Sequence, residues 1–153
     1  MATISSGDAE VALRTFPRRW RALLDHLDPD DPDTMALLGQ PGPDGRTALE
    51  SAAAAAATLE TGAVNLRRVL TSDQTAIERP GAAVGSSLAD SLQRIDAAAP
   101  ALADAVGGVG SSELDKSASL DGRPLTVREL IAAPVDEVAR YLRSASDALR
   151  SGR

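Results

Sequence analysis

The chain has 153 residues, 43% of them hydrophobic, which is enough for one domain with a buried core and too few for two. Its formal net charge of −6 argues against a nucleic-acid backbone or an anionic membrane surface as the main partner, because both would repel it. The chain contains no cysteine, which excludes disulfides, thiolate metal sites and cysteine nucleophiles.

The hydrophobic residues are mostly small or aliphatic, because the chain has only one Phe, one Trp and one Tyr. Alanine-rich surfaces pack best where backbones approach closely, which favours helices lying side by side. The first residues lack the basic and apolar segments of a signal peptide, and no stretch is apolar enough to span a membrane. We therefore expect a single domain over residues 1–153 in a soluble, cytoplasmic protein.

The first predicted helix covers residues 8–27. Its apolar stripe consists of Leu13, Phe16, Trp20, Leu23, Leu24 and Leu27. Ser6 or Asp8 could cap its start. Pro17 lies inside the stripe and would cost about 3 kcal/mol in an unbroken helix, so we expect a kink or break near Thr15. After an acidic connection, residues 34–38 are ambiguous between helix and loop.

The second predicted helix covers residues 47–71 and opens with a capping box formed by Thr47 and Glu50. Residues 52–57 are six consecutive alanines, the strongest helix formers. These alanines can have either of two roles. They let the helix lie close to its neighbours, or they leave a small pocket where larger side chains would have filled the interior.

The third and fourth predicted helices cover residues 87–106 and 126–150. The third carries a seam with alternating steps of four and three residues, namely Leu88, Leu92, Ile95, Ala99, Leu102 and Val106. Residues 111–120 cross back with a short extended piece. An Asp121-Gly122 turn precedes the fourth helix, which opens with a second capping box, Thr126 and Glu129. Four helices without a strand pattern between them predict an all-α four-helix bundle.

Several stretches together resemble one family. They are Leu-Asp-His-Leu-Asp-Pro-Asp-Asp at residues 24–31, Thr-Ala-Leu-Glu at 47–50, Asp-Gly-Arg-Pro-Leu-Thr-Val-Arg-Glu-Leu-Ile at 121–131 and Glu-Val-Ala-Arg-Tyr-Leu at 137–142. The pattern resembles the DinB/YfiT-like four-helix bundles, nearest to the mycothiol-dependent maleylpyruvate isomerase N-terminal domain family. It extends over nearly the whole chain.

That resemblance implies a zinc or nickel ion held by a His of the second helix and by two residues four apart on the fourth. These positions fall on or near Ala54, on Glu137 and on Tyr141 in this sequence. Only Glu137 could ligate in the usual way, and the chain has a single His, His26, beside Asp25 and Asp28. His26 is either a surface residue at a helix end or a displaced metal ligand. The metal site that the resemblance implies therefore lacks two of its three usual ligands in this sequence.

Glu137 and Tyr141 are the candidate catalytic residues. If both point inward, a carboxyl beside a phenol could bind a polar ligand or transfer a proton. Otherwise the carboxylate lies on the polar face and Tyr141 covers the core with its hydroxyl in water. The candidate ligand-pocket residues are Ala54, Glu137, Tyr141 and Trp20.

Two functions follow. In the first, a metal-free member of the family binds a small apolar molecule or a partner protein and has a binding or regulatory role, with no cofactor. In the second, the protein is a metal-dependent thiol transferase or isomerase that holds zinc or nickel with Glu137 and a non-standard ligand such as His26. A homodimer formed through one face of the bundle is a third hypothesis.

Overall fold

The computed structural model describes residues 4–28, 30–71, 76–81 and 87–151. Its elements, in chain order, are α1 (Ser6–Leu24), α2 (Pro32–Leu38), α3 (Ala48–Thr71), β1 (Ala76–Ile77), α4 (Leu88–Gly107), a 3-10 turn η1 (Ser111–Glu113), β2 (Ser117–Leu120), β3 (Arg123–Thr126) and α5 (Val127–Ser151). Most of the described chain is helical, which confirms the prediction of a mainly α-helical protein.

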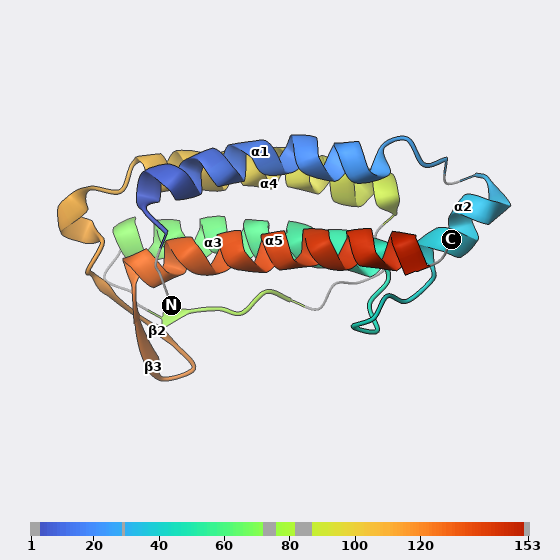
Figure 1. Ribbon diagram of the computed structural model, residues 1–153. Helices are drawn as coiled ribbons and strands as arrows, with labels where there is room; N and C mark the ends of the chain where they lie inside the picture. The colour runs from blue at the N-terminus through green and yellow to red at the C-terminus, as the bar shows by residue number, and fades with distance from the viewer. Residues whose placement is uncertain (1–3, 29, 72–75, 82–86, 152–153) are drawn as a thin grey trace.

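The four long helices lie in two layers, α1 with α4 and α3 with α5 (Figure 1). Within each layer the two helices are antiparallel, whereas α3 and α4 run in the same direction. The α3 helix packs extensively on both α4 and α5, and α1 packs mainly on α4. The described part of the connection between α3 and α4, residues 76–81, runs along the outside of the α3–α5 layer (Figure 1). No helix of the described residues is both long and apolar enough to cross a bilayer.

Local capping signals set the starts of the long helices. Thr47 and Glu50 exchange hydrogen bonds of 3.0 Å between each side chain and the other's backbone N–H. Thr126 and Glu129 do the same at 3.1 and 3.2 Å, and Ser87 caps α4. Because these bonds satisfy backbone donors that a helix leaves free, the predicted starts at 47, 87 and 126 are confirmed within one residue.

The first helix differs from the prediction. It is capped by Ser5 rather than Ser6 or Asp8, and it runs unbroken through Pro17 to Leu24. The missing N–H of Pro17 costs one hydrogen bond, but the apolar face on either side of it is fully buried, with Leu13 and Trp20 inaccessible to solvent. Tertiary packing therefore outweighs the local cost, and of the expected kink or break near Thr15 the break is wrong. Residues 34–38, which were ambiguous, belong to α2.

The structure contains a small sheet, of which the sequence predicted only a short extended piece within residues 111–120. Strands β2 and β3 form a hairpin whose turn residues, Asp121 and Gly122, have φ of +52° and +80°. Asp-Gly suits such a turn because Gly lacks a Cβ and Asp tolerates a left-handed backbone. The third strand, β1, pairs in parallel with β2. These strands have two or four residues each, which is too short to show a period of two in the sequence.

Asn65 attaches residues 76–81, which we call the crossing segment, to α3. This nearly buried amide donates a hydrogen bond to the Glu78 carbonyl (2.7 Å) and accepts one from the Glu78 backbone N–H (3.1 Å). These two bonds attach Glu78, the residue directly after β1, to the surface of α3. Because residues 77–81 border the cavities described below, Asn65 sets the position of one wall of them.

We expect Asn65→Asp to lower the free energy of unfolding by about 1 to 3 kcal/mol. A carboxylate cannot donate to the Glu78 carbonyl, and its charge would lie next to that oxygen. The measurement is urea unfolding, with Gln93→Glu as the matched control because this exposed amide lies on α4. Equal midpoints for the two variants would show that the amide contact does not hold the segment.

Candidate functional site

A pocket of about 430 Å³ lies between α3 and α5 and is bordered by the crossing segment. Three residues predicted from the sequence, Ala54, Glu137 and Tyr141, all line it. The other described residues of the lining are Arg46, Glu50, Thr58, Arg79, Pro80 and Gly81. The pocket therefore joins two helices to a segment that lies outside both.

Helical spacing explains how α3 and α5 supply their part of the lining. Glu50, Ala54 and Thr58 are each four residues apart on α3, and Glu137 and Tyr141 are four apart on α5. Residues four apart share one face of a helix, so two antiparallel helices present two facing rows. The small Ala54 side chain stands in the middle of its row. This leaves room between the Glu50 and Thr58 side chains.

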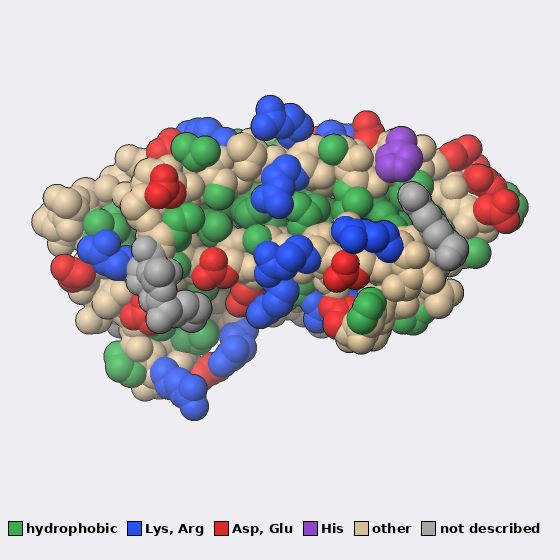
Figure 2. Space-filling model, in the orientation of Figure 1, with side chains coloured by type: hydrophobic (Ala, Val, Ile, Leu, Met, Phe, Trp, Pro, Cys, Tyr) green, Lys and Arg blue, Asp and Glu red, His purple; other side chains and the backbone are tan. Residues whose placement is uncertain are grey.

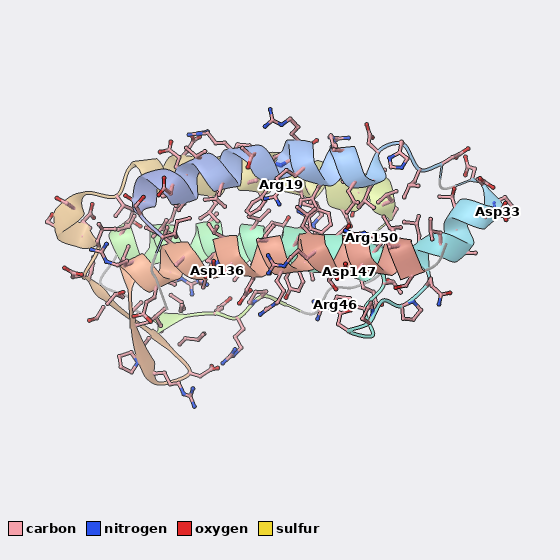
Figure 3. The ribbon with its side chains drawn as sticks, viewed as in Figure 1. Arg19, Asp33, Arg46, Asp136, Asp147 and Arg150 are labelled. Atoms are coloured by element: carbon pink, nitrogen blue, oxygen red, sulfur yellow. The ribbon has the colours of Figure 1, made fainter. Side chains whose placement is uncertain are left out.

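The loop before α3 brings Arg46 to the pocket. Gly42 lies so close to α5 that an added Cβ would be 3.0 Å from the Ala148 Cα, and Ser144 donates a hydrogen bond to the Asp44 carboxylate. With the loop held in this way, the Arg46 guanidinium stacks 4.7 Å from the centre of the Tyr141 ring. Figure 3 shows Arg46 on the side of α5 away from α1.

Two carboxyl groups around Arg46 have lowered pKa values. The hydrogen bond from Ser144, followed by the one from the Arg46 backbone N–H, holds the pKa of Asp44 below its usual value. Hydrogen bonds from Thr47, with the backbone N–H as the larger cause, lower the pKa of Glu50. Arg46 adds a smaller electrostatic contribution to both shifts. This end of the pocket is therefore charged at neutral pH.

The docking of this loop should depend on pH. Because the pKa of Asp44 is lower in the folded state, its ionised form stabilises the fold above the unfolded-state pKa of about 3.9, and this is lost as pH falls through the folded-state value. We expect the wild-type melting temperature to fall more steeply between about pH 5 and pH 2 than that of Asp44→Asn, which retains an acceptor for Ser144. If the melting temperatures of the two proteins fall equally with pH over this range, the prediction is wrong.

A smaller apolar cavity of about 120 Å³ adjoins the pocket. Its apolar wall comes from Ile77, Leu120, Leu125, Leu130, Ala133 and Pro134. It shares Thr58, Arg79, Pro80 and Glu137 with the larger pocket, so these four residues lie at the junction. Arg79 is held there by a 2.7 Å contact from its Nε to the Asp121 carboxylate in the hairpin turn. One continuous site therefore has an apolar end and a charged end.

Two residues proposed from the sequence lie elsewhere. Trp20, predicted as a pocket residue, is completely buried in the core and lines neither cavity, because its face of α1 packs inward. His26 is exposed in the connection after α1 and is likewise absent from both linings. The structure thus brings Ala54, Glu137 and Tyr141 to one pocket, and it places Trp20 in the core, so the prediction of Trp20 as a pocket residue was wrong.

Sequence reasoning missed six described residues of this lining: Pro80, Gly81 and four with polar side chains, Arg46, Glu50, Thr58 and Arg79. Glu50 and Thr58 could have been found, because they are one helical turn before and after Ala54. Glu50 was interpreted only as a helix cap. Arg46 and Arg79 come from loops whose positions depend on distant contacts, and no local pattern indicates them.

The site does not fit a zinc or nickel ion of the expected kind. Such ions usually have three protein ligands, commonly including imidazole, and the chain's one His lies outside the pocket. Within the described ranges, no three His, Asp or Glu side chains are grouped to hold a metal. Glu137 and Glu50 are the only acidic side chains in the described lining of the larger pocket.

A second, shallower groove of about 450 Å³ lies between α1 and α5. Its described lining residues are Arg19, Ala22, Leu23, Leu142, Arg143 and Ser146. Figure 2 shows apolar side chains along this seam with basic side chains beside them. It contains none of the predicted site residues.

Comparisons with models of known protein families, with curated protein sequences and with solved structures found no match for this chain.

Proposed function

We propose that the protein is a metal-free DinB-like four-helix bundle with a binding or regulatory role, and that it binds a small molecule in the pocket between α3 and α5. The observation that carries this proposal is the convergence of Ala54, Glu137 and Tyr141 on one open pocket. The two antiparallel helix pairs and the crossing segment between α3 and α4 support the bundle assignment.

The charged lining favours a small molecule that is only partly apolar. A wholly apolar ligand would fill the 120 Å³ cavity but would leave the charged groups of the larger pocket without new partners. A concave site with an apolar part and a few converging polar groups is typical of small-molecule binding. A flat protein partner would not reach Glu137, which lies half-buried at the junction of the two cavities.

Titration with the fluorescent dye 8-anilinonaphthalene-1-sulfonate tests this proposal, because the dye combines an aromatic body with an anionic group. We expect Ala54→Leu to weaken dye binding by about 10-fold or more, since its larger side chain would occupy the pocket. Ala22→Leu is the matched control, because it fills the α1–α5 groove instead. The proposal would be refuted if Ala22→Leu lost dye binding while Ala54→Leu kept it, or if the wild type bound no dye.

The alternative is a metal-dependent thiol transferase or isomerase. Glu137 favours this alternative because its carboxylate has no hydrogen-bond or ion-pair partner among the described residues. This function requires His26 or another ligand to reach Glu137, and His26 does not line the pocket. Metal analysis of the purified protein separates the two functions. Stoichiometric zinc or nickel that is lost in Glu137→Ala would establish the alternative.

A further inference from the structure

We infer that the ligand is a small zwitterion with a compact apolar group, of which an aliphatic α-amino acid is the simplest example. This inference rests on the proposed function and specifies the chemistry of the same site. It follows from the signs of the charges around the two cavities and from the size of the apolar one.

Charges of both signs line the pocket, and some are already engaged. Oε1 of Glu50 accepts the Thr47 backbone N–H, and Nε of Arg79 contacts Asp121. Arg46 and Glu137 make no ion pair with any described residue, although Arg46 stacks on Tyr141. The groups with most capacity for a ligand are therefore one cation and one anion, and not two groups of the same sign.

The apolar cavity sets the size of the ligand's apolar group. An engineered protein cavity of about 150 Å³ holds one benzene molecule, so a cavity of 120 Å³ suits a branched alkyl group of about four carbons. Glu137 and Thr58 border both cavities. A ligand with its alkyl group in the smaller cavity therefore places its adjoining polar atoms beside Glu137.

Charge pairing then determines which polar group of the ligand faces which side chain. An ammonium group at the junction pairs with Glu137, and a carboxylate extends toward Arg46, with Arg79 nearby on the rim. A ligand with a carboxylate alone would leave Glu137 unpaired beside a like charge. A ligand with an ammonium alone would offer no carboxylate to Arg46, which makes no ion pair with a described residue. A zwitterion avoids both costs.

Three small molecules test this inference on the wild-type protein. L-Leucine carries both charges, 4-methylpentanoate lacks the ammonium, and 3-methylbutylamine lacks the carboxylate. Dissociation constants are measured by following the backbone amide signals of Ala54 and Glu137 in NMR titrations. We expect L-leucine to bind at least about 10-fold more tightly than either analogue, because each lost charge pair removes a charge-assisted hydrogen bond.

Variants assign each charge to its partner. Glu137→Gln should weaken L-leucine about 10-fold and leave 4-methylpentanoate unaffected or tighter, whereas Arg46→Gln should weaken both. The matched controls are Asp136→Asn and Arg19→Gln, exposed residues outside both cavities, and neither should change binding. Circular dichroism and melting temperatures establish that each variant is folded.

The outcomes separate the ligand class from the proposed function. If 4-methylpentanoate or 3-methylbutylamine binds as tightly as L-leucine, the zwitterion inference is wrong, while small-molecule binding in the pocket stands. If none of the three shifts the Ala54 and Glu137 signals but the dye still requires the pocket, the inference is likewise wrong. If the dye also fails to bind, the proposed function is refuted together with it.

Discussion

Replacing Ile95 by alanine is expected to lower the free energy of unfolding by about 2 to 5 kcal/mol. Ile95 is fully buried in the seam of α4, all six residues of which are buried as the spacing predicted. Truncation removes apolar contacts and leaves a cavity that the surrounding helices can fill only in part. Urea unfolding monitored by circular dichroism measures the change as a shift in midpoint at constant slope.

Two further truncations and a control extend this test. Leu92→Ala should cost a similar amount, and Leu130→Ala should fall at the lower end, because Leu130 already borders the apolar cavity. Val64→Ala is the control, since this α3 side chain is 51% exposed, and we expect a change within about 0.5 kcal/mol. If all three truncations leave the midpoint unchanged, the helix phasing is wrong.

The second large effect should come from enlarging a buried alanine. Ala56→Leu is expected to destabilise the protein by about 1 to 3 kcal/mol, because Ala56 is completely buried and its larger replacement must displace neighbouring side chains. Ala54→Leu should change stability by less than about 0.5 kcal/mol, because Ala54 is half-buried and faces the open pocket. Thermal unfolding of both variants under identical conditions gives the comparison.

This pair also distinguishes the two roles considered for the alanine run at residues 52–57. Ala52, Ala53, Ala55 and Ala56 are buried and allow close helix packing, whereas Ala54 leaves space beside Glu137 and Tyr141. Both roles are therefore present in one run, divided by helix face. Equal destabilisation by Ala54→Leu and Ala56→Leu would show that Ala54 is a packing residue like the others.

Sequence-based prediction succeeded where the physical cause is local. The two capping boxes act between residues three apart, and the apolar faces of α4 and α5 follow from a repeat of 3.6 residues. The placement of Ala54, Glu137 and Tyr141 in one pocket was predicted by resemblance, and the spacing of four on α5 is consistent with it. The failures at Pro17 and Trp20 came from judging a residue by local cost or by type without its packing partners.

The sequence alone determined the long helices, their capped starts, the buried faces of α4 and α5 and the tight Asp121-Gly122 turn. Tertiary structure decided the pairing of β1 with β2, the unbroken course of α1 through Pro17 and the presence of Arg46 and Arg79 at the pocket. The physical reason is the range of the interactions. Caps and helix faces depend on neighbours within one or two turns, whereas the pocket's cations are held by Ser144, Ala148 and Asp121, which are far from them in sequence.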